Sequence, residues 1–261
     1  MSANPLGILK AKVNRTKAQI QNLDEAVRSF VSTNSYEIVS DLNFDGTERI
    51  WRFVLTNSDT SDLAVMAGEI IHNLRSALDN IACAVAEKHC GRTDRTYFPF
   101  GKDVDIFETQ LRLKGKDLPD DAIAMIRALK PYAGGNELLW ALHNLNRYDK
   151  HPGINTAQPA QGSRMRGLKV YSGRALIFGN RNGQHLIVDG YIPKVSAIAV
   201  QKEGEFLTTT PFAQFEYDGE PIFQISFNEV RGFEREPIVA VLHQMRDLVD
   251  GVLLAFQKRF F

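Results

Sequence analysis

The chain has 261 residues, long enough to bury a full hydrophobic core as one large domain or two small ones. Its composition, with 44% hydrophobic and 24% charged residues, is that of an ordinary globular protein and argues against wholesale disorder. Lys and Arg number 31 and balance the 31 Asp and Glu, so no global field attracts nucleic acid or an anionic membrane, and such binding would need a local patch.

The first predicted elements are a long helix and a β-hairpin. Between Leu9 and Phe30 the apolar residues follow a heptad-like spacing, which predicts an amphipathic helix over about 1–32. The segment 36–56 has β-branched and aromatic residues on both sides of Asp45-Gly46, a dipeptide that accepts positive φ in a tight turn. These features predict a hairpin at 36–56.

A second long helix, predicted over Asp62–His89, organises the rest of the chain. Its apolar residues recur at steps of three and four along one broad face: Leu63, Ala67, Ile70, Leu74, Ala77, Ile81 and Val85. On the other side, His72, Ser76 and Asp79 fall within about 60° of one another. Arg75 lies at the margin of this polar stripe. Such a helix is typical of one sunk into a core, with its stripe facing a cleft or a partner.

Both cysteines of the chain, Cys83 and Cys90, fall on this helix. Seven residues of regular helix separate their Cα atoms by about 10 Å, which exceeds disulfide reach. The N-terminus lacks the basic start and apolar core of a signal peptide, and no apolar run approaches the roughly 20 residues of a membrane span. We therefore expect a cytoplasmic protein without a membrane partner.

Three shorter helices are predicted next, over about Asp105–Leu113, Pro119–Leu129 and Asn136–His151. Before them, the YFPF segment at 97–100 is interpreted as a loop pinned by its aromatic residues. The third helix has an apolar stripe of leucines, while its polar and aromatic residues gather on another side: Trp140, His143, Asn144, Arg147 and His151. The polar faces of this helix and of Asp62–His89 could pack together and form a site.

From about 165 to 231 the hydrophobic period changes from 3.6 to 2, with turn signals at Asn182-Gly183 and Asp218-Gly219, which predicts five or six mostly antiparallel strands. A last helix is predicted over 236–261. The fold class is therefore α+β: a helical bundle over about 1–32, 60–152 and 236–261, an early β-hairpin at 36–56, and a β block at 165–231. Because helices bracket the strands, we expect a single unit over 1–261. Two separate domains are the alternative, and whether the block is a sandwich or a single sheet stays open.

Structural roles could also account for these polar residues. Arg75 and Asp79 have the i, i+4 spacing of an ordinary surface ion pair. Lys150 and His151 could offset the dipole at a helix C-terminus, and the histidines could be hydrogen-bonded core residues. Gly134-Gly135-Asn136 could cradle an anion with free N–H groups or simply begin a helix. The basic cluster of Arg164, Arg166 and Lys169 is typical of a solvated loop.

Two resemblances bear on function. The segments GEIIHNLRSALDNIA, YFPF and LKPYAGGNELLWALHNLNRYDKH resemble a group of uncharacterised bacterial proteins with an HNLRSALD helix and a later DKH, over about Asp62 to His151. More loosely, the chain resembles HEPN proteins, helical bundles that often act as metal-independent ribonucleases through an Arg and a His with four to six residues between them, usually with a polar residue directly after the Arg.

The chain departs from the HEPN pattern at both candidate positions. Arg75-Ser76 is followed at the family's spacing by Asn80, which cannot transfer protons at neutral pH and points about 140° away from Arg75 on a regular helix. Arg147 and His151 are the right residues with only three between them. The resemblance implies that a His acts as general acid or base on the ribose and an Arg stabilises the phosphorane.

Three functional hypotheses follow. The first is an HEPN-like protein acting on RNA, with a catalytic group of Arg75, His143, Arg147 and His151. The second is a non-catalytic module that binds a small ligand or forms a homodimer, with the binding residues His72, Ser76, Asp79, Asn80, Asn146, Asp149 and Lys150. The third is a metal-dependent enzyme with nitrogen and oxygen ligands from His72, Asp79, His143 and His151. Our prediction is for the first two, with no cofactor and no metal.

Overall fold

The computed structural model describes residues 5–33, 36–56, 59–148, 156–178, 185–188, 190–199, 205–227, 232–233 and 236–261. These residues form six helices and eight strands and confirm the α+β class. They divide into two compact units, each discontinuous in sequence. The helical unit comprises Met1–Val27, Thr60–Thr156 and Phe227–Phe261, and the β unit comprises Arg28–Asp59 and Ala157–Ser226. We had expected one unit, with two domains as the alternative.

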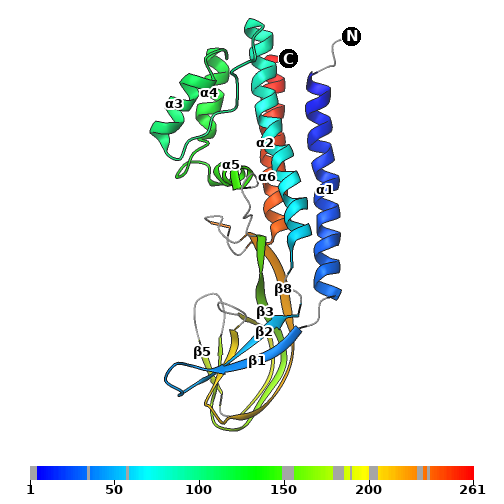
Figure 1. The fold of residues 1–261 in the computed structure, drawn as a ribbon, viewed down its shortest axis with the longest axis vertical. Helices are drawn as coiled ribbons and strands as arrows, with labels where there is room; N and C mark the ends of the chain where they lie inside the picture. Colours follow the sequence, from blue (N-terminus) through cyan, green and yellow to red (C-terminus); the bar gives the residue numbers. More distant parts are fainter. Residues whose placement is uncertain are drawn as a thin grey trace. The chain divides into compact units, whose positions relative to one another are not determined.

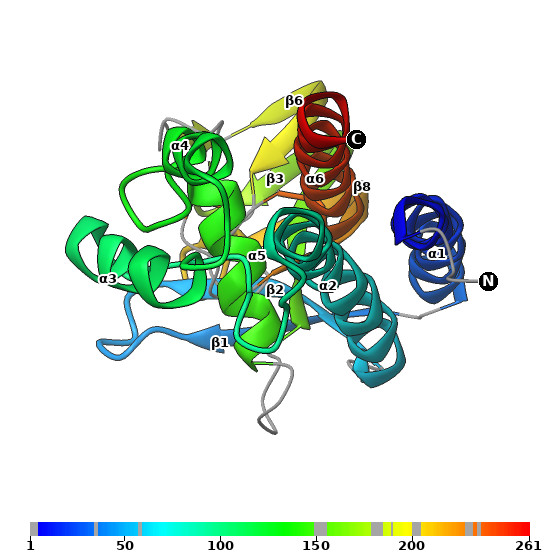
Figure 2. The same ribbon diagram turned by 90° about the horizontal axis from the view of Figure 1, so that it is seen from above.

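The helical unit is built around α2. Its six helices are α1 (Pro5–Thr33, of which the part to Val27 belongs to this unit), α2 (Ser61–Cys90), α3 (Val104–Lys114), α4 (Asp120–Leu129), α5 (Glu137–Tyr148) and α6 (Ile238–Phe260). The axes of α2 and α6 run side by side, and α1 and α5 flank α2 on different sides (Figures 1 and 2). The predicted helices are therefore all present where the structure describes the chain.

Short-range chemistry explains where these helices begin and end. Gly91 closes α2 in the left-handed conformation, with φ of 70°, and its N–H donates to the carbonyl of Glu87. The carboxylate of Asp103 caps α3 by accepting the N–H of Ile106. Apolar burial then fixes the arrangement, since α2 buries fourteen residues, all uncharged except Arg75, and α6 buries eight. Within the described residues, no helix has the length and apolar character needed to cross a membrane.

The β unit contains two sheets. The first has the strand order β1-β2-β7-β4-β5, from β1 (Tyr36–Leu42), β2 (Arg49–Leu55), β4 (Ala175–Phe178), β5 (His185–Val188) and β7 (Glu205–Thr209). The second has the order β6-β3-β8, from β3 (Thr156–Ser172), β6 (Tyr191–Ala199) and β8 (Gln214–Phe227). β1 and β2 pair antiparallel around the predicted turn, which confirms the hairpin.

The core of the β unit answers the question that the sequence left open. Its buried cluster joins side chains of both sheets: Phe53, Ala175, Phe206 and Leu207 from the first, and Leu168 and Val170 from the second. The β block together with the hairpin thus forms two sheets with a shared core, and not a single sheet.

The structure corrects two details of the predicted β block. Asp218-Gly219, interpreted as a turn, lies inside the continuous strand β8, where pairing with β3 overrides the local turn preference. Arg164, Arg166 and Lys169 lie on β3 and not in a loop, and Arg166 forms an ion pair with Asp218. The predicted turn at Asn182-Gly183 falls outside the described residues.

Candidate functional site

Arg75 and Asp79 hold the chain segment that follows α2. A side-chain nitrogen of Arg75, Nη2, donates to the carbonyl oxygen of Phe98 at 3.1 Å, and Asp79 Oδ1 accepts the N–H of the same residue at 2.9 Å. The two side chains also form an ion pair, with Arg75 Nη1 2.6 Å from Asp79 Oδ1, although the N–H bonds of this nitrogen are not aligned on an acceptor. Arg75 is only 7% exposed. The pair is therefore not the ordinary surface ion pair that its spacing suggested.

Close packing fixes the same segment further along. Phe98 and Phe100 are buried, as is Gly101, whose N–H donates to the carbonyl of Pro131 at 3.2 Å. A Cβ atom on Gly101 would lie 2.3 Å from the backbone nitrogen of Phe107, so no other residue fits there without a backbone shift. The loop predicted from YFPF is thus held against both α2 and the start of α3.

Phe100 forms the centre of a stack. The Arg75 guanidinium lies 4.5 Å from the centroid of the Phe100 ring, and the imidazole of His143 lies at the same distance from it, with 5° between the ring planes. Trp140 packs beside His143, with ring centroids 5.6 Å apart. The stack brings Arg75 on α2 and His143 on α5 to the same aromatic ring, although 67 residues lie between them in the sequence.

The protein environment keeps His143 neutral. Burial and, after it, the nearby positive charges of Arg75, Arg147 and Lys114, in that order, together lower the pKa of His143 from 6.5 to about 3. Its Nδ1 atom is buried and has no hydrogen-bond partner in the described part of the chain. A buried nitrogen that has no hydrogen-bond partner within the protein is normally bound to a water, an ion or a ligand.

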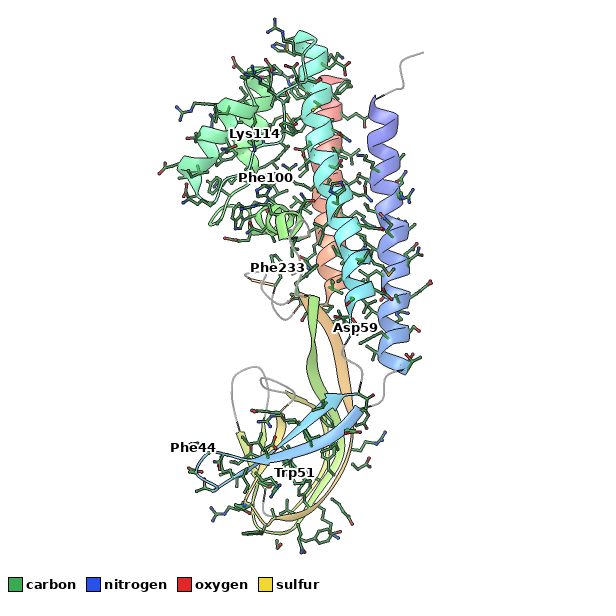
Figure 3. All side chains as sticks on the ribbon, viewed as in Figure 1. Phe44, Trp51, Asp59, Phe100, Lys114 and Phe233 are labelled. Carbon is green, nitrogen blue, oxygen red and sulfur yellow. The ribbon has the colours of Figure 1, made fainter. Side chains whose placement is uncertain are left out.

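Lys114, at the end of α3, also faces this group. Its ammonium is half-buried, and desolvation and the charge of Arg75 lower its pKa, against the smaller opposite effect of Asp79. Figure 3 labels Lys114 next to Phe100, on the side of α2 where α3 lies. Three cations thus act on His143, and Asp79 is the one carboxylate among the described groups whose charge acts on Lys114.

The remaining predicted residues of α2 do not share this site. His72 is exposed, and its Nδ1 lies 3.3 Å from Oδ1 of Asn146 on α5. Ser76 accepts a hydrogen bond of 2.8 Å from Nζ of Lys12 on α1, so it serves helix packing. Asn80 is half-buried on α2. The stripe that the sequence predicted as one surface is therefore divided among α1, α5 and the segment 96–100.

Part of the predicted site cannot be placed. Asp149, Lys150 and His151 fall outside the described residues. The pairing of Arg147 with His151 as catalytic residues therefore stays a prediction. Arg147 itself is exposed near the end of α5.

Two alternative sites find no support among the groups that can be placed. No cluster of three or more His, Cys, Asp or Glu suited to a metal ion occurs in the described ranges, where Asp79 already binds Phe98 and His72 lies against Asn146. At the start of α5, the side chain of Asn136 accepts the N–H of Leu139 and Glu137 accepts the N–H of Gly134. These N–H groups begin a helix and are already satisfied without an anion.

Sequence reasoning missed Lys114 and the role of Phe100. Lys114 lies on a separate short helix, and no periodic or motif signal connects it to His143. Phe100 was recognised as part of an aromatic loop, but its position between Arg75 and His143 depends on packing. The signal that could have found it is the combination of a buried Arg with a nearby Phe-Pro-Phe, since guanidinium groups stack on aromatic faces.

Comparisons with known proteins give no match: no protein-family model, no curated protein and no solved structure is significantly similar to the chain.

Proposed function

We propose that the helical unit binds a phosphate group of RNA at the site formed by His143, Lys114 and Arg147, without cleaving the RNA there. The observation that carries the proposal is an excess of positive charge around a buried, unpartnered imidazole nitrogen. Lys114 is partly desolvated beside other cations, which raises the free energy of its charged ammonium. A bound anion would offset that cost.

A phosphate suits this set of groups. Asp79 already compensates Arg75, which leaves the charges of Lys114 and Arg147 without an ion-pair partner in the described structure. A neutral imidazole with its proton on Nδ1 donates one hydrogen bond to a phosphate oxygen, while Lys and Arg supply charge-assisted bonds. The bound phosphate would in turn raise the pKa of His143, because an anion favours the protonated ring.

The same features favour binding over acid–base catalysis. A histidine with a pKa of about 3 is a weak base and is unprotonated at neutral pH, whereas proton transfer is most efficient when the pKa lies near the working pH. Arg75, expected to stabilise the charge of a transition state, is buried with its guanidinium bound to Phe98 and Asp79. We therefore assign Arg75 a structural role, and the protein is best described as a non-catalytic relative of HEPN-like ribonucleases.

RNA is the source of phosphate that the resemblance to HEPN proteins implies. Cys83 and Cys90 are free thiols, which supports the reducing cytoplasm proposed for this protein. The homodimer expected from the sequence is part of the same proposal. With zero net charge on the chain, binding depends on this local site.

The test is binding of a labelled structured RNA in EDTA, measured by filter retention at several salt concentrations. Neutralising Lys114 or Arg147 with Gln should weaken binding and reduce the slope of log K against log salt by about 0.7 for single-stranded contacts. Lys116→Gln is the matched control, because Lys116 is an exposed lysine just beyond α3 and should leave both quantities unchanged.

Two results would contradict the proposal. Equal affinity of the wild type, Lys114→Gln and Arg147→Gln for RNA would remove the phosphate site. Cleavage of the RNA by the wild type, abolished in Arg147→Gln, would establish a ribonuclease in place of a binding protein.

A further inference from the structure

The stack around Phe100 is part of a column of planar groups that leads outward from the core of the helical unit. At its inner end, Arg75 is 7% and Phe100 4% exposed, and the ring of His143 follows that of Phe100 in parallel. Trp140 comes next, with its ring 5.6 Å from that of His143 and an angle of 35° between the planes. Because Trp140 is only half-buried, the column ends on a large aromatic residue that solvent reaches.

Trp140 lies beside the charged site. Seven residues separate it from Arg147 on α5, so the two lie about 10 Å apart along nearly the same line of the helix, with His143 between them. A phosphate held by His143, Lys114 and Arg147 would therefore lie next to the indole.

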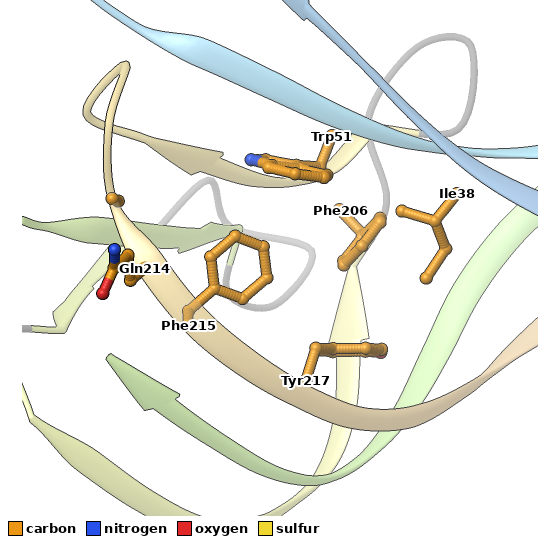
Figure 4. A pocket seen from close by; sticks show the side chains of 7 residues that line it. Ile38, Trp51, Phe206, Gln214, Phe215 and Tyr217 are labelled. Atoms are coloured by element: carbon orange, nitrogen blue, oxygen red, sulfur yellow. The ribbon is translucent and has the colours of Figure 1, made fainter. Parts of the chain in front are cut away.

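The other tryptophan of the chain, Trp51, has an aromatic environment without charge. It lines a cavity of about 440 Å³ in the β unit together with Phe206 and Phe215 (Figure 4). None of the residues that line this cavity is charged at neutral pH, whereas three cations act on His143. Of the two tryptophans, Trp140 is thus the one that lies next to groups able to hold a phosphate.

Cations beside an accessible aromatic ring suit a nucleotide, because the phosphate needs positive charge and the base can stack on a planar surface. We infer that a base adjacent to the bound phosphate stacks on Trp140, so that the site takes unpaired RNA in preference to a duplex. The inference rests on the proposed function, since the phosphate beside His143 brings the base to the indole. In an A-form duplex the bases stack on one another, and their faces are not available to a side chain.

Charge alone would give the opposite preference. Each phosphate contact releases more counterions from a duplex than from a single strand, so a purely cationic site should bind a duplex at least as tightly. Stacking of one base strengthens the binding of a single strand by about fivefold or more. A preference for unpaired RNA is therefore the property that separates a stacking role of Trp140 from simple attraction of phosphates.

The test compares a labelled unpaired oligoribonucleotide with the duplex that it forms with its complement, by filter retention in EDTA at one salt concentration. The wild type should bind the single strand at least about fivefold more tightly. Trp140→Leu should lose this preference through weaker binding of the single strand, with duplex binding unchanged. Trp140→Phe keeps a ring and should retain most of the preference, and Trp51→Phe is the control outside the site.

A second measurement leaves Trp140 in place. In Trp51→Phe, Trp140 is the single tryptophan of the chain, and the single strand should quench its fluorescence in a saturable way, whereas the duplex should not. Inorganic phosphate should protect Trp140→Leu against thermal unfolding as much as it protects the wild type. That result would show that the variant keeps the phosphate site and has lost only the stacking surface.

The outcomes distinguish this inference from the proposed function. Equal binding of single strand and duplex by the wild type, with Trp140 unquenched, would overturn the stacking role, while weaker binding by Lys114→Gln would still support the phosphate site. RNA binding that is unchanged in both Lys114→Gln and Arg147→Gln would overturn the proposed function and this inference with it. Quenching of Trp51 in Trp140→Phe would also overturn the inference, because the base would then enter the cavity of the β unit.

Discussion

The two units use aromatic rings in opposite ways. In the helical unit, Phe100 lies between a guanidinium and an imidazole, so an apolar ring packs directly against polar groups. In the β unit, Phe53 and Phe206 stack on one another inside an aromatic cluster, and the adjacent cavity has an uncharged lining. The positive charges around Phe100 are the basis of the anion site proposed for the helical unit, whereas the lining of the β-unit cavity carries no charge.

A charged residue on a helix that carries a candidate site can have a purely structural role. Arg75 was predicted to be catalytic because its type and spacing fit a nuclease pattern. In the folded chain Arg75 instead donates a hydrogen bond to the backbone carbonyl of Phe98. The positive charges near His143 that have no ion-pair partner in the described structure are those of Lys114 and Arg147. If so, the helical unit should be the more sensitive of the two to loss of a single charge.

Replacing Arg75 with Ala should have the largest effect. The change leaves Asp79 as a partly buried carboxylate without its counterion and the carbonyl of Phe98 without its donor. Removing one partner of a buried ion pair costs about 3–5 kcal/mol in the free energy of unfolding, which urea denaturation followed by circular dichroism would measure.

The control is Arg127→Ala. Arg127 forms a bidentate ion pair with Glu108 on the surface, with both side chains substantially exposed, and its loss should lower the free energy of unfolding far less than Arg75→Ala does. Comparable losses for Arg75→Ala and Arg127→Ala would show that Arg75 does not fasten the segment 96–100.

In the β unit, a backbone change should have the next largest effect. Gly173 has φ of 84°, and a Cβ atom there would lie 2.4 Å from Oγ1 of Thr210, the oxygen that accepts the N–H of Arg174. Gly173→Ala should therefore destabilise the β unit by about 1–3 kcal/mol. Since no charge is involved, the loss should be the same in low and high salt.

Gly190→Ala is the matched change in the same unit. A Cβ atom on Gly190 meets nothing within 4 Å, so this variant should unfold within about 0.5 kcal/mol of the wild type. An equal effect of the two substitutions would mean that the turn at Gly173 is more adaptable than its contacts indicate.

Sequence patterns predicted the elements well because each has a local cause. The apolar repeat of α2, the Asp45-Gly46 turn and the Gly91 stop all act over a few residues, and the structure confirms them. Asp218-Gly219 failed for the converse reason, since pairing within the sheet outweighed a local turn preference.

The candidate site was less predictable because it depends on contacts between distant segments. The sequence identified His143 and grouped it with the residues of α2, and α5 does pack on α2. It gave no indication that Ser76 would face Lys12 or that Lys114 would approach His143. Burial of Arg75 was equally hidden, because an i, i+4 pair has the same spacing on the surface and in the core.

The smallest predicted effect, the pH dependence contributed by His143, is also the most specific to the charged site. The unfolded chain binds a proton at this residue near pH 6.5, but the folded chain does so only near pH 3. The unfolded state therefore holds more protons between these values, and stability falls as the pH decreases through 6.5, by about 1 kcal/mol at pH 5.5 from this residue. His143→Gln should remove that part of the slope.

Phosphate should change the same quantity in the wild type. If the anion binds beside His143, the pKa of the folded form rises toward that of the unfolded chain, and the acid-side loss of stability shrinks in phosphate relative to chloride at equal ionic strength. In His143→Gln the two salts should give parallel pH profiles. Identical profiles in the wild type as well would mean that the cations near His143 do not hold an anion. The site would then be a packed junction of α2, α3 and α5.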